Sequence, residues 1–213
     1  SLSSEFMGYS VDERERVKEI FLWVAKNIDY DMEAVGASNY QLGSSYLSVF
    51  ERGKGLCLGY SNLFATICKH TGIESRIVTG YAKGQTYDSD ETFGRPNHAW
   101  NSVRIDDKWY LLDVAWASSM RMSIENQFGY LPNNQFTDQY LLDFFLVNPE
   151  AFLETHLPED PFWQLTGRPI GLSTFEAGED AIAGALATAA NTVNFEHIIE
   201  GHDALDSLDR VIC

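Results

Sequence analysis

The stretch Gly53-Lys54-Gly55-Leu56-Cys57-Leu58-Gly59-Tyr60-Ser61 places a cysteine directly after a glycine-rich break. From Leu56 onward, apolar residues recur at helical spacing, which predicts a helix over residues 56–71. A thiolate in the first turn of a helix faces unpaired backbone N–H groups and the positive end of the helix dipole, and both lower its pKa. Cys57 is therefore a candidate nucleophile. By itself this position is also typical of a small buried hydrophobic residue.

Strands are predicted after this helix. Glu74–Ala82, His98–Ile105 and Lys108–Trp116 are rich in β-branched and aromatic residues, and Asp106-Asp107 joins the last two as a hairpin turn. Val11–Asn27 has the periodicity of an amphipathic helix. Helices followed by antiparallel strands, without alternating parallel units, predict an α+β fold.

The hairpin sets the relation between a histidine and an aspartate. If Ile105 opposes Lys108, then Trp100 opposes Asp113, and His98 lies on the same face as both. His98 and Asp113 are then diagonal neighbours, about 7–8 Å apart at the backbone. His98 can take the proton of Cys57 as a general base, while Asp113 orients the imidazole. The sequence thus predicts a Cys57, His98, Asp113 triad.

Two further stretches extend the pattern around Cys57: Asn97-His98-Ala99-Trp100-Asn101 and Trp109-Tyr110-Leu111-Leu112-Asp113-Val114-Ala115-Trp116. Together the three stretches resemble the transglutaminase-like core, a superfamily of transglutaminases, peptide N-glycanases and many bacterial proteins assigned as cysteine proteases. Ala115 stands where threonine is frequent in that family. The resemblance implies a papain-like fold, in which the helix carrying Cys57 packs on an antiparallel sheet carrying His98 and Asp113.

The resemblance continues beyond this core to about Phe175. Phe145–Glu150, His156–Pro158 and Trp163–Leu165 resemble the segment that follows the core in kyphoscoliosis-peptidase-like proteins. We expect a catalytic domain over residues 1–137 and a C-terminal extension over 138–213. Within these, 121–137 is predicted to be a loop, 140–165 to contain one short helix, and 180–213 to be mostly helical.

Four residues are candidates for binding the substrate. Trp100 shares the face of His98, and Asn97 precedes His98 in the chain. Tyr46 and Gln41 precede Cys57 at distances that could fold back onto it, as a second oxyanion donor must, but spacing does not choose between them or Ser45.

No metal or organic cofactor is expected. Cysteine, histidine and aspartate all bind zinc, but no second cysteine or histidine lies near any triad residue in the sequence. His197 and His202 are five residues apart, which does not match one helix face.

The composition excludes some partners. The net charge is -16, with 31 acidic and 15 basic residues, so the surface repels phosphate backbones and nucleic acid is not an expected partner. The three cysteines, at 57, 68 and 213, do not form the pattern of a disulfide framework, and Cys68 is expected to be a packed, inert thiol. No apolar run is long enough to span a membrane. The first residues do not resemble a signal peptide. Because the chain does not start with methionine, removal of an earlier segment is compatible with the sequence, and a secreted, periplasmic or cytoplasmic location stays open.

These features predict a cysteine protease or amidase that attacks peptide or side-chain amides and forms a thioester on Cys57. Its expected partner is a protein or peptide substrate. Two alternatives stay open at this stage: a non-catalytic interaction module with the same fold, and a transamidating enzyme that crosslinks proteins.

Overall fold

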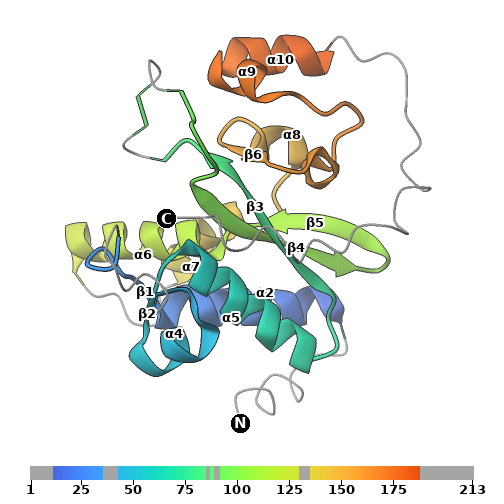
Figure 1. Ribbon diagram of the computed structural model, residues 1–213. Helices are drawn as coiled ribbons and strands as arrows, with labels where there is room; N and C mark the ends of the chain where they lie inside the picture. The colour runs from blue at the N-terminus through green and yellow to red at the C-terminus, as the bar shows by residue number, and fades with distance from the viewer. Residues whose placement is uncertain (1–11, 36–42, 85–86, 89–91, 130–134, 188–213) are drawn as a thin grey trace. The chain divides into compact units, whose positions relative to one another are not determined.

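The computed structural model describes residues 12–35, 43–84, 87–88, 92–129 and 135–187 (Figure 1). Its elements in chain order are α2 (Glu13–Asn27), β1 (Asp29–Tyr30), α4 (Tyr46–Arg52), β2 (Lys54–Gly55), α5 (Cys57–His70), β3 (Ser75–Ala82), β4 (His98–Ile105), β5 (Lys108–Leu112), α6 (Val114–Phe128), α7 (Gln135–Leu141), η1 (Leu142–Phe144), α8 (Pro149–Phe152), β6 (His156–Pro158), η2 (Pro161–Gln164), α9 (Leu172–Glu176) and α10 (Glu179–Ala187).

The described residues form two compact units. The first contains those up to Ile77 together with Ala99–Val147, and the second contains Val78–His98 and those from Asn148 onward. Each unit is therefore built from segments that are separated in the sequence. The predicted division into a catalytic domain, 1–137, and an extension, 138–213, concerns function and stays a prediction.

Helix α2 confirms the helix predicted near the start of the chain, and it supplies much of the first unit's core. Its apolar face is fully buried and comprises Val17, Ile20, Phe21, Val24 and Ala25. The helix begins at Glu13, after Asp12, whose carboxylate accepts a hydrogen bond from the Arg14 N–H. α2 packs against α5 and α6, so the helix that carries Cys57 rests on a continuous apolar surface.

Helix α5 begins at Cys57, one residue after the predicted start, and its first turn packs against backbone. The Leu56 N–H donates to the Gly43 carbonyl at 2.8 Å. A Cβ atom added to Gly59 would lie 2.0 Å from the same carbonyl oxygen. Glycine at position 59 is thus required by the close approach of another segment.

The hairpin has the register that the sequence predicts. β4 and β5 are antiparallel, Ile105 pairs with Lys108, and Asn101 pairs with Leu112. The turn residues Asp106 and Asp107 have φ of 48° and 62°, and positive φ at both central positions is typical of the tight turns that match strand twist. In the same unit the start of β3 lies beside β4, where the Arg104 N–H donates to the Glu74 carbonyl at 2.9 Å.

Two predictions about the region after the hairpin are wrong. β5 ends at Leu112 instead of Trp116, because the Asp113 carboxylate caps a new helix, α6. The described part of 121–137 is mostly helix instead of loop, since α6 continues to Phe128 and α7 begins at Gln135. The helical pattern is hard to recognise because α6 buries polar side chains: Ser118 is fully buried, and Arg121 donates to the Ala25 carbonyl at 3.0 Å.

The second unit contains the end of β3 and a strand that the sequence did not predict, β6. Gly80, Tyr81 and Ala82 pair antiparallel with residues 156–158. Besides the one short helix expected over 140–165, this stretch contains two 3-10 turns and β6.

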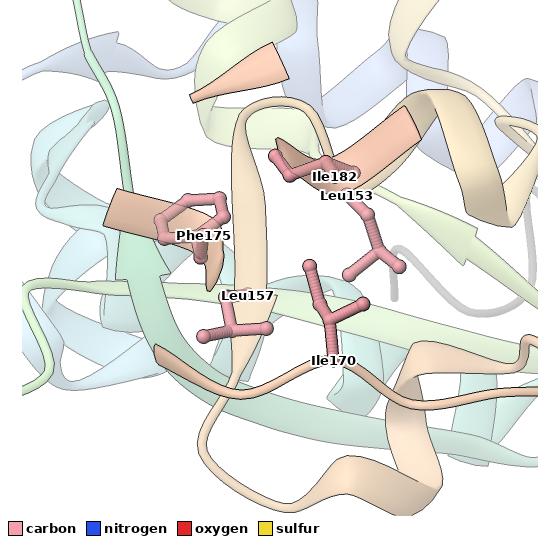
Figure 2. Packing of buried hydrophobic residues seen from close by; sticks show 5 residues of the cluster. All are labelled: Leu153, Leu157, Ile170, Phe175 and Ile182. Carbon is pink, nitrogen blue, oxygen red and sulfur yellow. The ribbon is translucent and has the colours of Figure 1, made fainter. Parts of the chain in front are cut away.

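The core of the second unit is a small apolar cluster (Figure 2): Leu153, Leu157, Ile170, Phe175 and Ile182. The cluster joins α9 and α10 to the segment around β6. α10 confirms the first part of the predicted helical tail, and residues 188–213 lie outside the described residues.

Candidate active site

Cys57 is the first residue of α5 and is fully buried. The residue before it, Leu56, provides no side-chain cap, so the N–H groups of the first turn are not satisfied by a capping side chain. In the structure Cys57 is disulfide-bonded, so any chemistry at its sulfur requires reduction first. Cys68, in contrast, is a free thiol whose pKa is raised by complete burial, as expected for an inert core residue.

Asp113 is fully buried at the start of α6 in the same unit. Its Oδ1 accepts a hydrogen bond from the Trp116 N–H at 2.9 Å, and its own N–H donates to the Phe144 carbonyl at 3.0 Å. These bonds fix the backbone and the carboxylate of Asp113 at a helix N-terminus, where negative charge is favoured.

Tyr30 is a polar residue of this unit that the sequence analysis missed. Burial and the negative charge of Asp113 raise the pKa of its hydroxyl to about 12, while a hydrogen bond with the backbone of Cys57 acts in the opposite direction. One phenol oxygen is thus near both Cys57 and Asp113. The sequence offers no motif for Tyr30, because it lies in a polar, glycine-punctuated stretch over residues 29–43.

His98 is the first residue of β4, belongs to the second unit and is 5% exposed. Its ring lies 5.6 Å from that of His156, measured between centroids. His156 stacks on Phe152 at 4.0 Å, and its Nδ1 lies 2.8 Å from the Thr155 Oγ1. His98 thus has a buried aromatic neighbourhood, and His156 is a second buried imidazole beside it. Proton transfer from Cys57 to His98 stays a prediction.

The four candidate substrate-binding residues have different environments. Trp100 is buried in the first unit. The Asn97 amide accepts from the Ala82 N–H at 2.7 Å and donates to the Ala82 carbonyl at 3.0 Å, so it fixes the end of β3. Tyr46 is 46% exposed on α4, and Gln41 lies outside the described residues. Their roles in binding stay predictions.

The sequence model of the transglutaminase-like superfamily matches residues 1–114, a range that includes Cys57, His98 and Asp113. The chain belongs to the transglutaminase-like superfamily. Its fold is the α+β arrangement expected for that superfamily, with helices and antiparallel strands.

Several known proteins are similar to the chain over most of its length. Kyphoscoliosis peptidase from Mus musculus and from Homo sapiens is 32% identical over 176 residues, which are 82% of this chain and 25% of those proteins. Hillarin from Drosophila melanogaster is 24% identical over 180 residues, 82% of this chain and 22% of hillarin. The chain thus spans about a quarter of the length of these relatives.

Among solved structures, one described as a TGase is 30% identical, with a TM-score of 0.42 over 63% of this chain and 31% of that chain.

Within the described part of this chain, none of the helices has both the length and the hydrophobicity needed to cross a membrane.

Proposed function

We propose that the chain is a cysteine hydrolase, a protease or amidase that cleaves peptide or side-chain amides through a thioester on Cys57. The observation that carries the proposal is the position of Cys57 at the start of α5, where Leu56 provides no side-chain cap. The buried Asp113 carboxylate and the backbone of Cys57 both lie near the Tyr30 hydroxyl. The superfamily membership and the similarity to a protein named as a peptidase support this reaction class.

The first half of the proposed reaction forms the thioester. His98 takes the proton from the Cys57 sulfur, and the thiolate attacks the amide carbon to give a tetrahedral intermediate with a negative oxygen. When the carbon–nitrogen bond breaks, His98 returns the proton to the leaving amine.

In the second half, His98 takes a proton from water as the water attacks the thioester. The carbon–sulfur bond then breaks and His98 protonates the departing thiolate, which gives a carboxylic acid and restores the Cys57 thiol. Asp113 stabilises the imidazolium form of His98 in both halves. If a primary amine attacks in place of water, the same thioester yields a new amide, which is transamidation.

The first test is the reactivity of Cys57 in protein that has been reduced with dithiothreitol and then freed of reductant. Two probes are used, iodoacetamide and p-nitrophenyl acetate, and mass spectrometry identifies the modified cysteine. We expect iodoacetamide to alkylate Cys57 with an apparent pKa well below about 8.5, the usual value of a free cysteine. We expect p-nitrophenyl acetate to acetylate Cys57 with release of nitrophenolate.

Two variants serve as matched controls. Cys57→Ala is expected to abolish both modifications, whereas Cys68→Ala, which removes the other described cysteine, is expected to leave both rates unchanged. His98→Ala should return the reactivity of Cys57 to that of a model thiol.

The outcomes separate the alternatives. A Cys57 that reacts no faster than glutathione, with no acetylation, rules out the proposed hydrolase and favours a non-catalytic interaction module. Efficient incorporation of a primary amine into a glutamine-containing protein, in preference to hydrolysis, indicates transamidation instead.

A further inference from the structure

Tyr30 lies beside the segment that leads into α5. β1 and β2 pair in parallel, with Tyr30 opposite Gly55, and the Asp31 N–H donates to the Gly55 carbonyl at 3.0 Å. Cys57 follows Gly55 by two residues. The short strand pair therefore brings the backbone of Tyr30 next to the N-terminus of the helix that carries the nucleophile.

The hydroxyl of Tyr30 accepts a hydrogen bond from the Cys57 N–H. The bond involves the backbone of Cys57, and it lowers the pKa of the phenol, which means that it favours the ionised form. Only a hydrogen-bond donor can stabilise a phenolate. The backbone donor of Cys57 is its N–H, so the phenol oxygen is in front of this group. In cysteine and serine hydrolases, the same position relative to the nucleophile's N–H is where the oxyanion forms.

The Tyr30 ring is fixed by its neighbours in the same unit. It stacks on the Tyr60 ring with centroids 6.3 Å apart and an interplanar angle of 17°. The Tyr60 hydroxyl in turn donates to the Ile28 carbonyl at 2.7 Å and lies 2.9 Å from the Ser118 hydroxyl. These contacts keep the phenol at the start of α5, from where its O–H can reach an oxygen that takes its place in front of the Cys57 N–H.

We propose that the Tyr30 hydroxyl is the second oxyanion donor of the Cys57 site, alongside the Cys57 N–H. The substrate's carbonyl oxygen takes the place of the phenol oxygen in front of that N–H, and the phenol O–H then donates to the negative oxygen as it develops. This assignment rests on the proposed hydrolase function. No proton is transferred from Tyr30, because the phenol stays neutral and acts only as a hydrogen-bond donor.

Comparing the two probes tests this role of Tyr30. Acetylation by p-nitrophenyl acetate passes through an oxyanion, whereas alkylation by iodoacetamide displaces iodide and forms none. Tyr30→Phe is expected to slow acetylation of Cys57 about 100-fold, the usual loss for one oxyanion donor, and to leave the alkylation rate within about 2-fold of wild type. Tyr140→Phe, which removes a hydroxyl from a 39% exposed side chain on α7, is the matched control and should leave both rates unchanged.

Each outcome decides one question. Equal acetylation in wild type and Tyr30→Phe overturns the assignment and leaves the hydrolase proposal intact. An equal fall in both rates also overturns it, because Tyr30 would then act on the thiolate and not on the oxyanion. If wild-type Cys57 is not acetylated, the hydrolase proposal fails and the assignment fails with it.

Circular dichroism and thermal unfolding show whether the variants are folded. If Tyr30→Phe does not fold, Tyr30→Met removes the same hydroxyl with a flexible side chain of similar reach, and the same expected fall and the same overturning results apply to it.

Discussion

The two helices that begin at candidate active-site residues start in different ways. α6 starts at a side-chain cap, where the Asp113 carboxylate accepts the Trp116 N–H. α5 follows Leu56, which cannot cap, and the N–H of its first residue, Cys57, is bonded instead to the Tyr30 hydroxyl. Both starts are buried in the same unit, and both satisfy a backbone donor.

The two helix starts differ in whether a substrate oxygen can replace the group that is bonded to the backbone N–H. A carboxylate cap is part of the helix that it stabilises, so its removal costs stability. A hydroxyl from another segment can be replaced by a substrate oxygen without unfolding the helix. The capped start is therefore suited to fixing a charged residue, and the uncapped start to binding a developing negative charge.

The largest expected effect is that of Asp113→Asn. Asparagine is as good a cap as aspartate, so α6 should keep its stability, but the charge that stabilises the imidazolium is lost. We expect the acetylation rate of Cys57 to fall about 10³–10⁴-fold, as in other triads, with little change in the urea midpoint.

Asp113→Ala separates the cap from the charge. It should show the same loss of activity and a further loss of about 1 kcal/mol in the free energy of unfolding. A variant Asp113→Asn with full activity would mean that Asp113 serves only as a cap, and the contrast between the two helix starts would then have no catalytic meaning.

A smaller effect is expected for Gly59→Ala, which tests the packing of the α5 start. The added methyl group would lie 2.0 Å from the Gly43 oxygen and 2.7 Å from the Val49 Cγ2, so backbone must shift. We expect a loss of about 3 kcal/mol in the free energy of unfolding, measured with urea.

Gly184→Ala is the matched control, since it lies inside α10 and the added methyl group meets nothing within 4 Å. It should raise stability by about 0.5–1 kcal/mol, because alanine loses less conformational freedom than glycine in a helix. If Gly59→Ala were equally harmless, the first turn of α5 would be loosely packed and the fixed geometry of Cys57 would be in doubt.

The smallest effect is alkaline destabilisation through Tyr30. The pKa of Tyr30 is about 12 in the fold and 10.0 ordinarily. Its contribution to the free energy of unfolding is therefore complete below pH 10 and is lost as the pH rises toward 12. The sign follows because the unfolded chain releases the proton first.

Tyr30→Phe removes this contribution. Between pH 9 and 11 the variant should therefore lose about 1 kcal/mol less stability than wild type, measured by urea unfolding at each pH. Identical pH dependence in the two proteins would mean that the phenol is not in the buried, Asp113-facing environment on which the comparison depends.

Much of this geometry was predictable from local sequence. The glycines before Cys57 and the apolar period after Leu56 predicted where α5 begins, and the structure agrees within one residue. The two-residue Asp106-Asp107 turn predicted the hairpin register, because side chains alternate between faces and one inserted residue would reverse them.

Other parts were not predictable, for reasons visible in particular residues. Arg121 looks like a surface or loop residue in the sequence, but in α6 it is buried. Its guanidinium donates to the Ala25 and Ile28 carbonyls and forms an ion pair with Asp29. Tyr30 has no motif at all, and its proximity to Cys57 depends on a parallel pairing between two-residue strands that are separated by 23 residues.

The sequence by itself determined three things: the position of Cys57 at a helix start, the register of the β4–β5 hairpin, and the superfamily. Each depends on residues close together in the chain. Only the tertiary structure decided that Asp113 caps α6 and that the Tyr30 hydroxyl bonds the Cys57 N–H. The cap is a local bond between Asp113 and Trp116, but the Tyr30 bond joins distant segments, and its energy depends on burial and charge that no local pattern encodes.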